Sequence, residues 1–216
     1  GFFDRPWPSA TRTIDGKPDL EDFTAVEEYS LLESYVEEGR KLDGFGTNSP
    51  IFLRFDAPID THLLPSAAES RNPDSAVFLV NIDPRSPDRG ELTAIEWDFQ
   101  EESTRWQPDN FLALQPVWGM PLRPATEYAL VVTTDIAEQD SEFENIGSRS
   151  IASASGWQDL ADTLRLLHFD QDRIAFATQF RTQDTTSEMA RLVHRVQEAM
   201  FTDVLDQPVS FLRSNQ

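Results

Sequence analysis

Short apolar segments alternate with proline- and glycine-containing turns through the middle of the chain, and this pattern constrains the fold more than any other feature. Segments rich in β-branched and aromatic residues are typical of strands. Five of them follow one another: 51–55, 76–81, 92–99, 111–117 and 127–134. No helical pattern separates them, so each strand is expected to pair with its neighbours through short turns. The pattern therefore predicts a mainly β protein with an antiparallel β-sandwich, not alternating strands and helices.

Two segments carry additional detail. In 92–99 the alternation changes phase near Ile95, which indicates a β-bulge. Residues 172–182 form a further predicted strand, which is expected to close the sandwich. One face of that strand carries Ile174, Phe176, Thr178 and Phe180.

Three segments have the signals of helices. A Thr-x-x-Glu capping box at residues 24–27 predicts a helix that ends near Leu42. A short helical insertion is predicted near 157–168, before the last strand, and a third helix follows residue 185. The third helix has an apolar stripe of Met189, Leu192, Val193, Val196 and Met200.

The order of these segments predicts three parts. Residues 1–46 form an arm rich in aromatic residues and proline, together with the first helix, packed on the sandwich. Residues 47–184 form the sandwich with its helical insertion, and residues 185–216 form the last helix and a tail. Aromatic side chains can hold such an arm in place, because burying each one contributes about 1.5–3 kcal/mol.

Charge and composition exclude several classes of function. The chain contains 38 acidic and 18 basic residues, which gives a formal net charge of −20 at pH 7. This charge repels nucleic acid and anionic membranes, so neither is expected as a partner. The absence of cysteine excludes disulfides and thiolate chemistry. No apolar run is long enough to span a bilayer, so no transmembrane segment is predicted.

Four segments together point to a known kind of domain: Phe2–Ser9, Asn48–Phe55, Leu122–Tyr128 and Asp172–Asp184. They resemble the N-terminal immunoglobulin-like domain of bacterial exported proteins, as found ahead of extracellular lipase- or esterase-type α/β-hydrolases. The resemblance implies an immunoglobulin-like sandwich in which the hydroxyl of Tyr128 binds the chain beside its own turn. It also implies an extracellular or cell-surface location. A signal peptide or lipid anchor is expected to be missing here, because the sequence starts at Gly1 without an initiator methionine.

The same resemblance implies a non-catalytic accessory domain that positions a downstream module of the same polypeptide or a cell-surface partner. The alternative is the N-terminal part of a lipase- or esterase-type hydrolase whose catalytic residues lie beyond Gln216. No Gly-x-Ser-x-Gly nucleophile elbow occurs within the chain, so no catalytic residue is assigned. Whether the parent protein is an enzyme stays open.

Isolated polar residues are weaker catalytic candidates. His62 follows Asp60 at a spacing that a triad fragment would have, but an ordinary surface loop explains the pair better. Glu96 and Asp98 share one strand face, as an acid–base pair would and as solvent-facing residues do. Of the remaining histidines, His168 is expected to be partly buried at a helix end, and His194 is expected to be solvated on a helix.

A calcium- or carbohydrate-binding adhesion module is the third possibility. Calcium takes about six to eight oxygen ligands, several of them carboxylates. Two segments offer carboxylates: Asp83 and Asp88 in the first, and Glu138, Asp140, Glu142 and Glu144 in the second. Neither segment has the EF-hand spacing, and a plain acidic loop is the alternative. Trp106 and Trp118 are expected to be exposed, and a sugar ring could stack on either of them.

Overall fold

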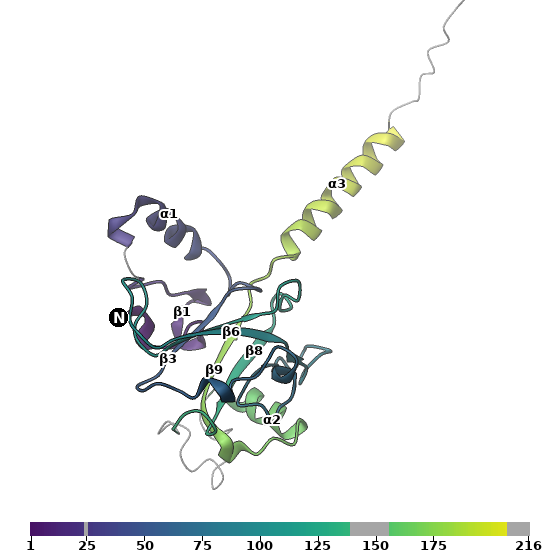
Figure 1. The fold of residues 1–216 in the computed structure, drawn as a ribbon. Helices are drawn as coiled ribbons and strands as arrows, with labels where there is room; N and C mark the ends of the chain where they lie inside the picture. The colour runs from purple at the N-terminus through teal and green to yellow at the C-terminus, as the bar shows by residue number, and fades with distance from the viewer. Residues whose placement is uncertain (24–25, 139–155, 207–216) are drawn as a thin grey trace, which may run out of the picture. The chain divides into compact units, whose positions relative to one another are not determined.

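The structure is a computed structural model that describes residues 1–23, 26–138 and 156–206 (Figure 1). The chain divides into two compact units, Gly1–Gln183 and Asp184–Gln216. All the described strands belong to the first unit, and the second contains a single described helix, α3 (Ser187–Asp206). The protein is therefore mainly β, as the sequence predicts.

The strands form three antiparallel sheets. The three-stranded sheet has the order β3 (Ile51–Arg54), β7 (Phe111–Pro116) and β6 (Ile95–Gln100). The four-stranded sheet has the order β5 (Leu92–Thr93), β4 (Val77–Asn81), β8 (Glu127–Thr133) and β9 (Ile174–Arg181). The third is a hairpin of β1 (Thr13–Ile14) and β2 (Lys17–Pro18). Each of the six predicted strand segments contains strand structure, with boundaries that differ by a few residues.

The predicted change of phase near Ile95 is a passage from one sheet to the other and not a bulge. β5 pairs with β4 in the four-stranded sheet, whereas β6 pairs with β7 in the three-stranded sheet. Ala94 lies between β5 and β6, is buried, and accepts a hydrogen bond from the backbone amide of Val117 at 3.0 Å. One continuous segment therefore joins the two large sheets.

Apolar clusters cover both faces of the four-stranded sheet. The first cluster lies between the two large sheets and includes Leu53, Leu79, Leu112, Leu130 and Val132. The second packs beneath α2 (Gln158–Leu166), which lies beside this sheet in Figure 1, and includes Phe78, Val80, Val131, Leu160 and Leu164. Because both faces are covered, all five residues of β4 are buried, and the strand shows no apolar–polar alternation.

β9 does not keep the single face that its alternation predicts. A register shift between Val132 and Thr133 of β8 places Ile174 opposite Thr133, and Ile174 joins the cluster beneath α2. Phe180 lies in the other cluster, between the sheets. The prediction that Ile174 and Phe180 share a face is wrong, because an extra residue in one strand reverses the alternation of side chains beyond it.

The N-terminal arm covers strand edges on one side of the unit. Trp7 exchanges two backbone hydrogen bonds with Phe52 of β3. The hydroxyl of Thr178 in β9 donates to the carbonyl of Pro8 at 3.0 Å. The arm thus touches an outer strand of each large sheet, and a covered edge is closed to pairing with another chain.

The arm is folded into short turns and a hairpin. It contains two 3₁₀ turns, η1 (Phe2–Asp4) and η2 (Ala10–Arg12), followed by the β1-β2 hairpin. The hairpin turns at Asp15 and Gly16, whose φ angles are 53° and 76°. The guanidinium of Arg12 lies 3.8 Å from the centre of the Phe2 ring and donates to the Phe2 carbonyl at 2.6 Å. Burial lowers the pKa of Arg12.

The first helix is shorter than predicted. It comprises a 3₁₀ turn, η3 (Val26–Glu28), and α1 (Ser30–Gly39), while residues 24–25 of the capping box lie outside the described residues. Val36 is the buried residue of α1. The helix is therefore held to the unit by a narrow contact.

The segment after α1 is fixed to the end of β9. Phe45 forms a parallel bridge with Thr182, and its backbone amide donates to the carbonyl of Arg181 at 2.9 Å. The amide of Gln183 donates to the carbonyl of Phe45 at 2.7 Å. Gly44 approaches this backbone so closely that a Cβ atom there would lie 2.7 Å from the carbonyl carbon of Thr182.

In the second unit, Asp184 caps the start of α3. The side chain of Asp184 accepts hydrogen bonds from the amides of Ser187 and Thr186 at 3.0 and 3.2 Å. A hydrogen bond from the Ser187 side chain, together with these two amides, lowers the pKa of Asp184 to about 2. The capping group is therefore one residue earlier than the predicted Thr185. The stripe side chains that the structure describes, Met189, Leu192, Val193 and Val196, are exposed.

Candidate functional site

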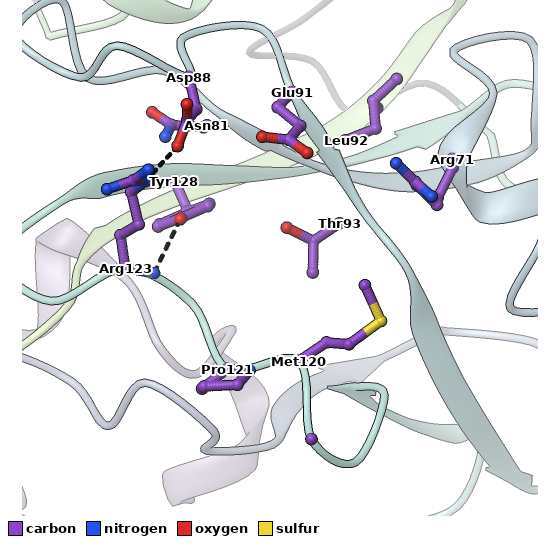
Figure 2. Close-up of a pocket in the computed structure, with 11 residues that line it drawn as sticks. Arg71, Asn81, Asp88, Glu91, Leu92, Thr93, Met120, Pro121, Arg123 and Tyr128 are labelled. Carbon is purple, nitrogen blue, oxygen red and sulfur yellow. Dashed lines mark hydrogen bonds and ion pairs between the residues drawn. The ribbon is translucent and has the colours of Figure 1, made fainter.

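An open pocket of about 380 Å³ lies at one end of the four-stranded sheet (Figure 2). Its walls come from β4, β5 and β8, from the turn before β8, and from η5 (Glu69–Arg71). The residues that line it are Arg71, Asn81, Asp88, Glu91, Leu92, Thr93, Gly119, Met120, Pro121, Arg123 and Tyr128. The lining combines charged, hydroxyl-bearing and apolar side chains, so it offers both polar and apolar contacts to a ligand.

Tyr128 fixes the turn that forms the lower wall in Figure 2. Its hydroxyl accepts a hydrogen bond from the backbone amide of Arg123 at 3.0 Å, drawn as a dashed line in the figure. This contact between the Tyr128 hydroxyl and its own turn is the one that the sequence analysis expects. Burial raises the pKa of Tyr128, so the hydroxyl stays protonated at neutral pH.

Two arginines line the pocket, and they differ in their partners. Arg123 forms an ion pair with Asp88, which neutralises both groups. Arg71 is exposed, and no carboxylate of a described residue lies within 4.0 Å of its guanidinium. The carboxylate of Glu91 likewise has no ion-pair partner among the residues that the structure describes. With respect to the residues that the structure describes, the pocket therefore contains one cation and one anion that are free for a ligand.

Asp83, a predicted calcium ligand, is bound to arginine. Its side chain is only 4% exposed, and it accepts hydrogen bonds from the amide and Nε of Arg85 at 2.9 and 3.2 Å. Arg181 Nη1 lies 3.7 Å from its second oxygen. Burial by itself would raise the pKa of Asp83, but the hydrogen bonds and charge of Arg85 outweigh it and hold the pKa below its ordinary value of 3.8.

Glu127 has the opposite shift. Burial raises the pKa of Glu127, and the nearby charge of Asp83 adds to the effect. Arg181 Nη1 lies between them, 3.9 Å from Glu127 Oε1. Oppositely shifted carboxylates are typical of acid–base pairs. Here Arg181 pairs with both Asp83 and Glu127, and this joins the ends of β4, β8 and β9. Neither carboxylate lines the described pocket.

We expect Asp83→Asn to lower the free energy of unfolding by about 1.5–3 kcal/mol at pH 7, the usual contribution of a hydrogen-bonded charge. Because the folded-state pKa of Asp83 lies below 3.8, its stabilisation is present above that pH and is lost as pH falls through the folded pKa. Urea denaturation at pH 7 and at successively lower pH measures the difference between wild type and variant. A difference that stays constant down to the acid limb would show that the charge of Asp83 contributes nothing.

Of the other predicted calcium ligands, the structure describes Asp88 and Glu138. Asp88 is paired with Arg123, Glu138 is exposed, and Asp140 lies outside the described residues, as do Glu142 and Glu144. Within the described ranges, no group of three or more histidine, aspartate or glutamate side chains is placed to hold a metal ion. Calcium binding by the acidic segment around Asp140 remains a prediction.

The three histidines belong to three different segments of the chain. The carboxylate of Asp60 accepts a hydrogen bond from the backbone amide of His62, which makes it the cap of a 3₁₀ turn, η4 (Thr61–Leu63). His168 is exposed, and its φ of 54° ends α2, so the expectation of partial burial is wrong. His194 is exposed on α3, 3.4 Å from Glu198.

Two acidic residues of β6 and two tryptophans are exposed to solvent, as the sequence predicts. Glu96 and Asp98 face solvent. Trp118 is 73% exposed and Trp106 is 45% exposed, as predicted. Trp118 directly precedes Gly119 and Met120, which line the pocket. The exposed ring of Trp118 therefore belongs to the turn that forms one wall of the pocket.

Compared with protein-family models, with curated proteins and with solved structures, the chain matches none of them. The resemblance to an immunoglobulin-like domain thus rests on the quoted sequence segments. Among the described residues, no helix combines the length and apolar character that crossing a bilayer requires.

Proposed function

We propose that this chain is a non-catalytic interaction domain of an exported bacterial protein, with an immunoglobulin-like sandwich that positions a neighbouring module. The observation that carries the proposal is the apolar stripe of α3. Its described members, Met189, Leu192, Val193 and Val196, are 47–63% exposed, although each is large and apolar. Burying one such side chain contributes about 1.5–3 kcal/mol, so a helix face of this kind is suited to docking.

The chemistry of the first unit supports a positioning role. Its buried charged groups are engaged in holding the fold together, as Arg12 holds the arm and Asp83 holds Arg85 and Arg181. Both faces of its four-stranded sheet are covered, which favours a rigid body. A rigid domain followed by an amphipathic helix can hold a second module in a defined position.

The double variant Leu192→Gln, Val196→Gln tests the docking role in the natural gene product isolated from its own cell. Intact mass spectrometry first measures that product; a mass well above 24.5 kDa agrees with an additional module. Hydrogen–deuterium exchange then measures the amides of α3. We expect the double variant to raise their exchange rate about tenfold or more, since about 1.4 kcal/mol of lost packing corresponds to a factor of ten.

The matched control is Arg191→Gln, Arg195→Gln, which changes the opposite face of the same helix and is expected to leave exchange unchanged. Equal exchange in the two double variants would contradict docking through the apolar stripe. A native mass near 24.5 kDa would contradict a neighbouring module on the same polypeptide and leave a separate surface partner.

Carbohydrate binding is a second candidate function. The specific observation in its favour is the exposed ring of Trp118 on the turn that also forms the pocket wall. Stacking of an aromatic ring against the C–H face of a sugar is one use of an exposed tryptophan.

A further inference from the structure

We propose that the pocket binds an acidic sugar, whose carboxylate pairs with Arg71 and whose hydroxyls bind Thr93 and Glu91. Figure 2 shows the guanidinium of Arg71, the side chain of Thr93 and the carboxylate of Glu91 around one common space. Arg71 ends η5, Thr93 lies in β5, and Glu91 directly precedes β5, which pairs with β4. This proposal is independent of the docking role of α3.

Arg71 supplies positive charge to the pocket. The chain carries a net charge of −20, and an exposed arginine in such a chain has many potential partners. Arg123, in the same pocket, does have one, because it is paired with Asp88. Arg71 has no carboxylate within ion-pair distance among the described residues, so its fork of N–H donors is available to a ligand carboxylate.

The free anion restricts the ligand further. Glu91 would repel a simple anion, and it accepts hydrogen bonds only. A ligand that satisfies both groups must present a carboxylate toward Arg71 and donors toward Glu91. Thr93, which lies below Glu91 in Figure 2, can donate or accept. Acidic sugars carry a carboxylate and several hydroxyls on one small ring, and amino acids carry a carboxylate and an ammonium group.

The apolar parts of the site favour the sugar. Met120 and Pro121 line the opposite wall and offer contact surface without hydrogen-bonding demands. The volume of about 380 Å³ is at the lower end of the range for small-molecule sites, which suits one or two sugar rings.

Isothermal titration calorimetry of the whole chain tests the proposal with three probes: a uronic acid disaccharide, its neutral counterpart, and free glutamate. We expect the uronic acid disaccharide to bind, and Arg71→Gln to weaken it about tenfold or more through loss of a charge-assisted pair. The control is Arg40→Gln, which removes an equally exposed arginine outside the pocket and is expected to leave affinity unchanged. Thermal unfolding of both variants verifies that the fold is intact.

Three other outcomes of the titration would contradict the proposal. Binding of the neutral disaccharide with the same affinity would overturn the role of Arg71. Binding of glutamate alone, lost in Arg71→Gln, would replace the sugar with an amino acid and overturn the sugar assignment. Failure of all three probes to bind at millimolar concentration would overturn the site.

Discussion

Replacing Leu164 with alanine is expected to lower the free energy of unfolding by about 2–5 kcal/mol. Leu164 is fully buried in the cluster between α2 and the four-stranded sheet. The substitution removes its packing contacts and leaves a cavity that the rigid strands can fill only in part. Urea denaturation followed by circular dichroism measures the loss.

Leu166 provides the matched control, because it belongs to the same helix and is 63% exposed. Leu166→Ala is expected to change the free energy of unfolding by no more than about 0.5 kcal/mol. The pair therefore isolates packing from helix propensity. Equal and small losses in the two variants would show that α2 does not cover the sheet.

Replacing Gly44 with alanine is expected to lower the free energy of unfolding by about 3 kcal/mol, the upper part of the usual range for overpacking. The added Cβ would lie 2.7–2.8 Å from backbone atoms of Thr182 and Gln183, and backbone atoms cannot rotate away as a side chain can. The clash would push Phe45 from β9 and lengthen its two hydrogen bonds.

Gly46→Ala is the control two residues later. There the added Cβ meets mainly the side chain of Ser49, which can change rotamer. We expect Gly46→Ala to cost less than Gly44→Ala by about 1–2 kcal/mol in the same denaturation experiment. A Gly44→Ala protein as stable as wild type would show that the Phe45 segment does not lie against β9.

Apolar, β-branched and aromatic residues predict the strands because the strands bury such side chains in the core. The central strand β4 shows why burial alone is ambiguous, since both of its faces are covered and its sequence does not alternate. The passage at Ala94 is visible in the sequence as a change of phase, but alternation does not tell a bulge from a move between sheets. The position of Ile174 is missed because a register shift depends on the partner strand.

The arm and the site are less accessible to sequence reasoning. Proline and aromatic residues predict that the arm is anchored, but its 3₁₀ turns depend on contacts with residues far along the chain, such as Thr178. Exposure of Trp106 and Trp118 follows from the polar turns around them. Arg71 and Glu91 have no motif, since they are twenty positions apart and only the fold places both at one pocket.

The anchoring of Gln183 has a mechanical consequence. Its amide donates to Phe45 and its carbonyl accepts from Ala125, so the last residue of the first unit is tied to two different segments. Phe45 and Thr182 form a parallel bridge, a geometry in which tension along the chain loads neighbouring hydrogen bonds together in shear. Tension applied from beyond Gln183 would therefore spread into the arm and into the turn before β8, and β9 would not peel away one bond at a time.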